Sequence, residues 1–156
     1  MSRLAVILFI VLILTSLSAL GGELEDVTAQ LKRHSAPDAV SAHELAPVII
    51  SLSHFYGIPS KLLTSVLLQE SKGREKAYNR VTKDTGILQV NIRKAQDLRL
   101  SQECLLSWRC NLAAGAKILA RTKNQPCGYN LGENRIIAGK FVELCEDYES
   151  KLRNNG

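Results

Sequence analysis

One carboxyl group stands out in the sequence because of the residues that precede it on a predicted helix. Residues 61–71 have helical spacing, and Glu70 shares one face with the apolar residues Leu63, Val66 and Leu67. A carboxyl group set among aliphatic side chains is difficult to ionise, so we expect a raised pKa for Glu70. Such a group can donate a proton near neutral pH, as a general acid must. The spacing is equally compatible with an exposed glutamate at a frayed helix end.

Two segments that follow this helix are candidates for the walls of a substrate cleft. Residues 73–85 form a long polar stretch without apolar periodicity, and long connections of this kind tend to be functional. Residues 86–91 then form a glycine-led apolar hexamer that contains the isolated amide of Gln89. We expect Gln89 either to face outward from a turn of buried strand or to lie against a sugar-binding cleft. Asn91 is a suitable cap for a short helix that continues to residue 98.

The remaining periodicity is helical, and strand content is low. We expect further helices at about 22–33, 39–56, 112–123 and 134–152. Pro47 must either start or kink the second of these, while Ser60 and Asn111 are the predicted N-caps of the helices that follow them. The predicted fold class is therefore mostly α, with one domain and minimal β-structure.

The N-terminus has the pattern of a cleavable signal peptide. Arg3 precedes an apolar run at 4–14, and small residues follow up to residue 22. We expect residues 1–21 to be removed and 22–156 to form the domain, which would act in the periplasm or be secreted. The apolar run is short for a membrane span, which favours cleavage, and an uncleaved anchor is the alternative.

The cysteine content agrees with export. The chain has four cysteines, all after residue 100, and an even number is typical of an oxidising compartment. Of the three possible pairings we favour Cys104–Cys110 with Cys127–Cys145, because each pair closes a local loop. Neither the cysteines nor the three histidines have metal-ligand spacing, so we expect no metal.

The formal charge of +5 suits a polyanionic partner, and in a cell envelope the candidates are the glycan-peptide wall and lipid headgroups. The basic residues are scattered and aromatic residues are few, so we do not expect nucleic-acid binding.

Four motifs occur in a fixed order over about residues 45–152, and together they resemble the soluble lytic transglycosylase (SLT) family. The likeness is greatest to its small branch associated with secretion and invasion. The corresponding segments here are Gln69-Glu70-Ser71, Gly86-Ile87-Leu88-Gln89-Val90-Asn91, Asn111-Leu112-Ala113-Ala114-Gly115-Ala116-Lys117-Ile118-Leu119 and Tyr129-Asn130-Leu131-Gly132. Leu88 replaces the family's usual Met, and the interval before Tyr129 is shorter than the family norm.

This resemblance implies a lysozyme-like domain with a catalytic cleft that cleaves the bond between N-acetylmuramic acid and N-acetylglucosamine in peptidoglycan. It implies Glu70 as acid and then base, a 1,6-anhydro product, and no cofactor. The implied partners are glycan strands and a secretion, pilus or conjugation apparatus, with the protein itself a monomer. The implied substrate-binding residues are Gln89, Asn91, Tyr129 and Asn130, while Ser71 and Asn79 would support the acid.

Two alternatives differ in chemistry. A hydrolase like the goose-type lysozymes would need a second carboxylate to activate water, and Glu75 and Asp84 are the nearby candidates. The other alternative is a wall-binding or secretion-assembly module that retains the fold without turnover.

Overall fold

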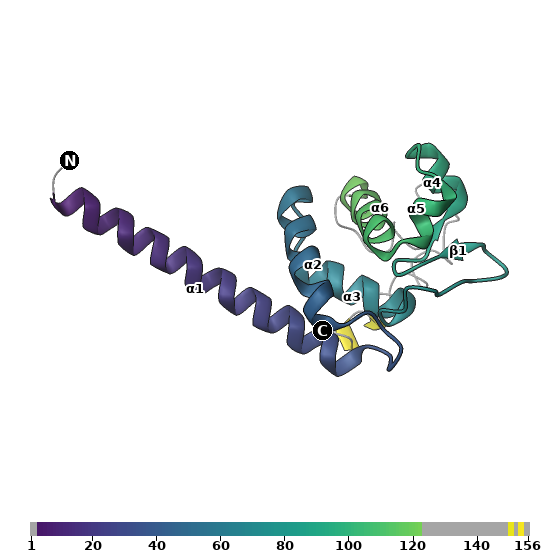
Figure 1. Ribbon diagram of the computed structural model, residues 1–156, viewed down its shortest axis with the longest axis horizontal. Coiled ribbons are helices and arrows are strands. Elements are labelled where there is room, and N and C mark those ends of the chain that lie inside the picture. Colours follow the sequence, from purple (N-terminus) through teal and green to yellow (C-terminus); the bar gives the residue numbers. More distant parts are fainter. Residues whose placement is uncertain (1–2, 123–149, 152, 155–156) are drawn as a thin grey trace.

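The computed structural model describes residues 3–122, 150–151 and 153–154, and this part of the chain is mostly helical (Figure 1). The predicted fold class is therefore confirmed. The helices are α1 (Arg3–His34), α2 (Ala42–Tyr56), α3 (Ser60–Ser71), α4 (Ile92–Asp97), α5 (Gln102–Leu106) and α6 (Trp108–Arg121). The strands β1 (Asp84–Thr85) and β2 (Val90–Asn91) form one small antiparallel sheet, with Asp84 opposite Asn91 and Thr85 opposite Val90.

The first helix is much longer than the predicted helix at 22–33. It runs without interruption from Arg3, and its N-terminal part extends away from the other helices (Figure 1). The side chains of residues 6–12 are exposed. Among the described residues, no helix meets the length and apolarity needed to cross a membrane.

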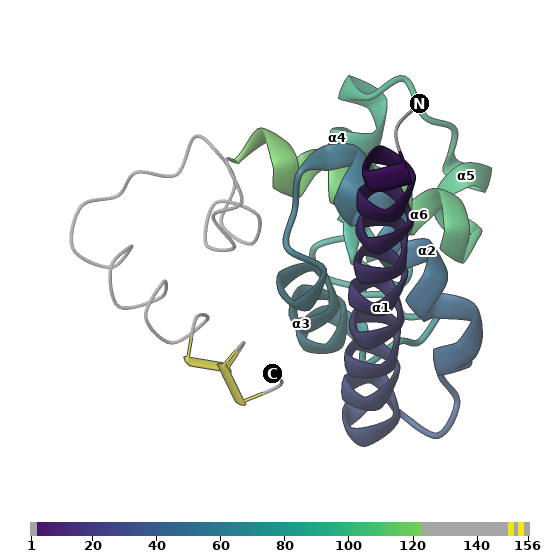
Figure 2. The same cartoon turned by 90° about the vertical axis from the view of Figure 1, so that its left-hand side faces the viewer.

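The C-terminal part of α1 belongs to the core. Helices α2 and α3 both pack against it (Figure 2), and Val27 and Leu31 are buried in the same cluster as the leucines of α3. Between them, the buried Gln30 donates a hydrogen bond from Nε2 to Oγ of Ser65, at 2.9 Å. Residues 27–31 therefore help to fix the position of α3.

The helix ends show where the predicted caps were wrong. Ser60 is the first residue of α3 rather than its cap, because the carbonyl of Pro59 already accepts from the N–H of Leu63 at 3.1 Å. Pro47 lies inside α2, which begins at Ala42 after the cap Ser41.

Asn111 is likewise not a cap. Helix α6 begins three residues earlier, at the buried Trp108, and Ser107 is its N-cap. The N–H of Asn111 donates within the helix to the carbonyl of Ser107 at 2.9 Å.

The structure contains the expected disulfide Cys104–Cys110, which joins α5 to the first turn of α6. The Cys127–Cys145 pair lies outside the described residues, as does all but the end of the helix expected at 134–152.

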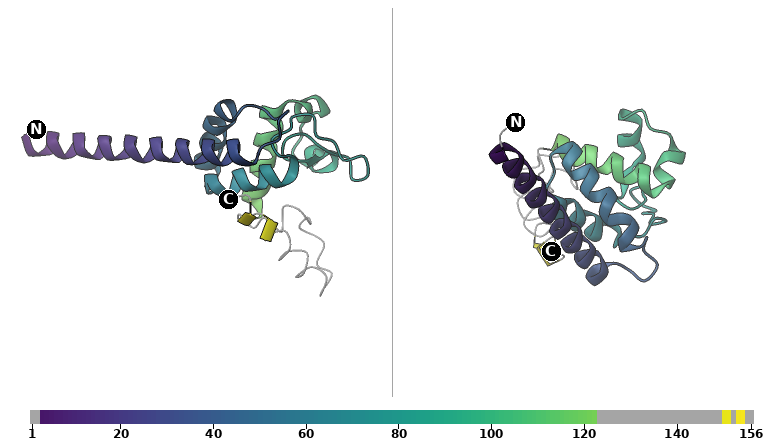
Figure 3. Two further views of the ribbon diagram at one scale, coloured as in Figure 1. Left: turned by 90° about the horizontal axis from the view of Figure 1, so that it is seen from below. Right: turned by 60° about the vertical axis from the view of Figure 1, so that its left-hand side comes forward.

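A loop between Tyr78 and β1 projects from the end of the molecule opposite to the N-terminus (Figure 3). An isolated bridge pairs Tyr78 with Thr85, and the N–H of Asn79 donates to the carbonyl of Asp84 at 2.9 Å. The loop is therefore closed at its base.

Candidate active site

Glu70 occupies the last turn of α3, whose apolar face is buried as predicted. Leu63, Val66 and Leu67 are fully buried, whereas Glu70 is only partly buried. The helix ends immediately afterwards, because Lys72 adopts the left-handed conformation (φ 54°) and its N–H donates to the carbonyl of Leu68 at 3.0 Å. The chain then turns away from the helix axis and leaves the Glu70 carboxyl at the surface of a hollow.

This hollow, the Glu70 pocket, has a volume of about 570 Å³ and is open to solvent. It brings together four of the predicted site residues, namely Glu70, Ser71, Asn79 and Gln89. The rest of its lining is polar or cationic apart from one alanine and one tyrosine: Gln69, Lys72, Arg74, Ala77, Tyr78 and Arg80.

Ser71 connects the end of α3 to the hexamer at 86–91. Its buried hydroxyl donates to the carbonyl of Ile87 at 2.6 Å and accepts from the N–H of Gly73 at 3.1 Å. The hydroxyl therefore holds the Gln89 segment beside the helix turn that carries Glu70. This arrangement matches the predicted supporting role better than a direct contact with sugar.

Gln89 belongs to a tight turn rather than to a strand. Residues 86–89 form this turn and β2 begins only at Val90, so the expected buried strand is shorter than predicted. Gln89 has a left-handed backbone (φ 47°), and its side-chain Nε2 donates to the carbonyl of Gly86 at 2.9 Å. The turn thus places Gln89 in the lining of the Glu70 pocket, with its amide nitrogen bonded back to the turn.

Asn111 is a positioning residue that the sequence did not reveal. It is fully buried, and its Oδ1 accepts from the N–H of Leu88 at 2.9 Å. Its Nδ2 donates to the carbonyls of Thr85 and Leu105, at 2.7 and 3.0 Å. Its sequence signals were a polar residue inside the apolar stripe of α6 and its position at the start of a family motif. Neither signal could separate this role from that of a cap.

Asn79 and Asn91 shape the loops around the pocket. Oδ1 of Asn79 accepts from the N–H groups of Val81 and Thr82, at 3.0 and 3.3 Å. Asn91 caps α4 as predicted, since its Oδ1 accepts from the N–H of Arg93 at 3.0 Å. It does not line the Glu70 pocket.

The two candidate second carboxylates are both directed elsewhere. Oε1 of Glu75 accepts from the backbone N–H of Trp108 at 3.3 Å. Oδ1 of Asp84 accepts from Nδ2 of Asn91 at 2.7 Å, while its other oxygen accepts from Thr82. Neither residue lines the Glu70 pocket, so within the described residues Glu70 is the one carboxylate there.

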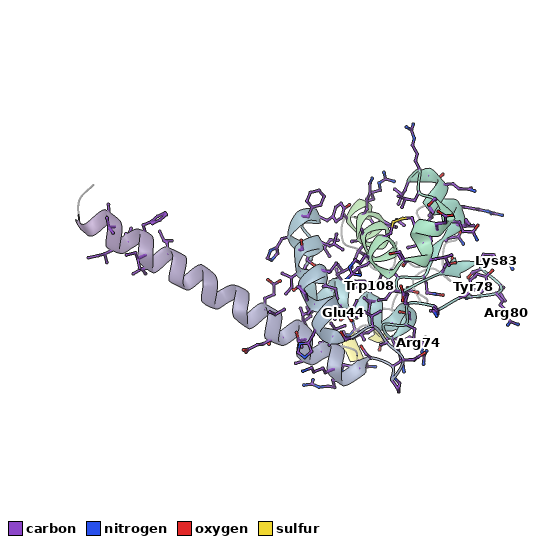
Figure 4. The ribbon with its side chains drawn as sticks, in the orientation of Figure 1. Glu44, Arg74, Tyr78, Arg80, Lys83 and Trp108 are labelled. Carbon is purple, nitrogen blue, oxygen red and sulfur yellow. A yellow bond between two sulfur atoms is a disulfide. The ribbon has the colours of Figure 1, made fainter. Side chains whose placement is uncertain are left out.

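A larger hollow of about 720 Å³ lies beside the Glu70 pocket and shares Arg74 and Ala77 with it. Its wall includes Glu44 and Trp108 (Figure 4). Nε of Arg74 donates to Oδ1 of Asp38 at 2.9 Å, and this hydrogen bond holds the pKa of the Asp38 carboxyl below its usual value. Of the described residues considered for the site, only Glu75, the candidate second carboxylate of a hydrolase, lines this hollow. Its larger size therefore does not make it the catalytic candidate.

Two predicted site residues, Tyr129 and Asn130, lie outside the described residues. In the part that is described, no group of three or more histidine, cysteine, aspartate or glutamate side chains is arranged to hold a metal ion.

Comparison with known proteins gives one result. The family model described as "Transglycosylase SLT domain" matches residues 47–139, from within α2 to beyond α6. The match includes Glu70, the turn with Gln89, and Asn111. No curated protein and no solved structure matches the chain.

Proposed function

Because the chain belongs to the transglycosylase SLT domain family, which acts on peptidoglycan, we propose that it is a lytic transglycosylase with Glu70 as its catalytic residue. The bond cleaved is the β-1,4 linkage between N-acetylmuramic acid and N-acetylglucosamine. The observation that carries the proposal is the position of Glu70, on the end of a buried helix and in a pocket that it shares with Gln89.

One carboxyl group can serve both halves of this reaction. Glu70 gives its proton to the bridging oxygen as the bond to the muramic acid C1 breaks, and the substrate's acetamido group stabilises the cationic sugar. The Glu70 carboxylate then takes the proton of the C6 hydroxyl while that oxygen bonds to C1. The product is a 1,6-anhydro sugar, and the carboxyl group is protonated again.

The surrounding residues position this chemistry. Gln89 is proposed to hydrogen-bond the sugar, because its turn faces the pocket, and Ser71 holds that turn against α3. We propose Tyr129 and Asn130 as substrate contacts on the strength of the family motif alone. Asn91 is assigned a supporting role, since its side chain is bonded to Asp84 and to the first turn of α4.

Hydrolysis is less well supported than transglycosylation. An inverting hydrolase needs a second carboxylate that activates water, about 6.5–9.5 Å from the acid. Within the described residues, Glu75 and Asp84 are bonded to Trp108 and Asn91 instead and do not line the pocket.

The proposed setting is the cell wall. We propose residues 1–21 as a cleavable signal peptide and 22–156 as a monomeric domain that acts in the periplasm or after secretion. The sequence pattern at 3–22 supports export, and the Cys104–Cys110 disulfide fits an oxidising compartment. We propose that the enzyme opens the cell wall locally for a secretion, pilus or conjugation apparatus.

Digestion of purified sacculi with the wild type and with Glu70→Gln tests the proposal. The wild type should release muropeptides with 1,6-anhydro ends, identified by mass spectrometry. Glu70→Gln should release them at least about a hundredfold more slowly, because removal of a general acid costs a factor of this order or more. The exposed Glu103 on α5 supplies the control Glu103→Gln, which should retain activity.

Three results would contradict the proposal in different ways. Undiminished lysis by Glu70→Gln would remove the acid assignment. Products with reducing ends would indicate a hydrolase. Binding to sacculi without any release of muropeptides would indicate a wall-binding module.

A further inference from the structure

The Glu70 pocket has an excess of positive charge. Its lining includes Lys72, Arg74 and Arg80, while Glu70 is its one acidic residue among those described. Lys72 and Arg80 are exposed at the pocket's edge. A cleft lined mostly by one sign of charge attracts ligands of the opposite sign.

Within the described residues, only one of these three cations is paired with a neighbouring acid. Glu75 is bonded to the N–H of Trp108, and Asp84 is bonded to Asn91. Within the described residues, Arg74 forms an ion pair with Asp38, whereas Lys72 and Arg80 form none. As far as the described part of the chain shows, two cations of the pocket therefore have no acidic partner.

The positive charge continues along the projecting loop. Arg80 and Lys83 lie near its end, with Tyr78 at its base (Figure 4), and the Lys83 ammonium is 6.0 Å from the centroid of the Tyr78 ring. The loop is held in shape by Asn79, whose carbonyl accepts from the N–H of Lys83 at 2.8 Å. The cations are thus carried on a closed loop rather than on a free end.

From this arrangement we propose that Lys72 and Arg80 bind the carboxylates of the peptide stems of peptidoglycan. The inference rests on the proposed function. Each muramic acid carries a stem peptide with free carboxylates close to the bond that is cleaved, whereas an uncharged β-1,4 polymer of N-acetylglucosamine has none. Guanidinium groups match carboxylates with paired hydrogen bonds. Lys72 and Arg80 therefore select glycan strands that carry peptides.

The proposal is tested by removing the negative charge of the substrate's carboxylates and, separately, the positive charge of the Lys72 and Arg80 side chains. Soluble, uncrosslinked glycan strands are compared before and after their carboxylates are converted to methylamides. Wild-type kcat/KM should fall five- to tenfold on amidation, as about 0.5 kcal/mol or more for each of two exposed ion pairs implies. The double variant Lys72→Gln/Arg80→Gln should show the same fall on intact strands and no further fall on amidated ones.

Matched controls separate this effect from general charge. Arg93 and Lys117 are exposed, lie on α4 and α6, and do not line the pocket. The variant Arg93→Gln/Lys117→Gln should therefore behave as the wild type on both substrates. Strands whose stems have been removed by an amidase retain only the lactyl carboxylate, and wild-type kcat/KM on them should also fall.

The inference would be overturned if the wild type cleaved intact and amidated strands equally fast. It would also be overturned if the Lys72/Arg80 variant lost the same factor on both substrates, or if stem-free strands were cleaved as fast as intact ones. Glu70→Gln should be inactive on all of these substrates. The proposed function is therefore judged separately from the role of the cations.

Discussion

The carboxamide of Asn111 bonds to three backbone groups, all of them outside its own helix. These are the N–H of Leu88 and the carbonyls of Thr85 and Leu105. The Asn111 side chain is fully buried. If its amide is removed, water cannot take its place as the hydrogen-bond partner of the three backbone groups. One amide thus joins α5, α6, β1 and the turn that carries Gln89.

Replacement of Asn111 by leucine should lower the free energy of unfolding by about 3 kcal/mol, because three buried backbone groups lose their partner. Urea denaturation measures this loss. Lytic activity should fall further than the unfolded fraction explains, since the Gln89 turn is released.

Asn111→Asp provides a sharper comparison. Its carboxylate can accept from Leu88 but cannot donate to Thr85 or Leu105, so the folded state raises the pKa of this new carboxyl group. Protonation restores one donor. Above the folded-state pKa, Asn111→Asp should therefore show its full loss of unfolding free energy relative to the wild type. This loss should shrink as pH falls below that pKa. A loss that does not change with pH would contradict this account.

At the scale of elements, the sequence predicted helices well and their ends poorly. The buried face of α3 followed from the spacing of its leucines, and the cap at Asn91 followed from local chemistry. The start of α6 could not be predicted in this way, because Ser107 and Asn111 are both good local caps. The burial of Trp108 and the disulfide at Cys110 favour the earlier start, and these depend on tertiary contacts.

The candidate site was predictable to a similar extent. Glu70, Ser71 and Gln89 lie in motifs, and the structure brings them together at one pocket. The positioning role of Asn111 and the cationic lining were not predictable, because both depend on which segments meet in space. Lys72 and Arg80 are ordinary surface residues in the sequence and become notable only beside Glu70.

The turn at Gly86 allows no side chain. Gly86 has φ +79°, and a Cβ there would lie 2.4 Å from Nδ2 of Asn111 and 2.9 Å from the carbonyl oxygen of Leu105. Gly86→Ala should therefore lower the free energy of unfolding by about 3 kcal/mol or more, through backbone strain and displacement of Asn111.

Gly57 is the matched control for this prediction. It also has a positive φ, +66°, but nothing lies within 4 Å of its hypothetical Cβ. Gly57→Ala should cost only about 1 kcal/mol, the price of the left-handed conformation. Equal losses in the two variants, measured by urea denaturation, would show that the contact with Asn111 is unimportant.

At the scale of the whole molecule, α1 has two parts with different surroundings. The side chains of residues 6–12 are exposed, whereas Val27, Gln30 and Leu31 are buried against α2 and α3. The expected cleavage near residue 21 would fall between these parts. The family match begins only at residue 47, so the buried part of α1 lies outside the matched region although Val27 and Leu31 belong to the core cluster.

Shortening the chain from its N-terminus should therefore change stability in one abrupt step. A chain that begins at Gly22 should unfold at the same urea concentration as the full chain, because it keeps Val27, Gln30 and Leu31. A chain that begins at Pro37 should lose about 4 kcal/mol or more of its free energy of unfolding, since two buried apolar side chains contribute about 1.5–3 kcal/mol each and Ser65 loses its partner.

Gln30→Ala in the chain from Gly22 isolates the hydrogen bond to Ser65 and should lower the free energy of unfolding by about 1 kcal/mol. Equal stability of the chains from Gly22 and from Pro37 would mean that α1 packs on a core that is complete without it.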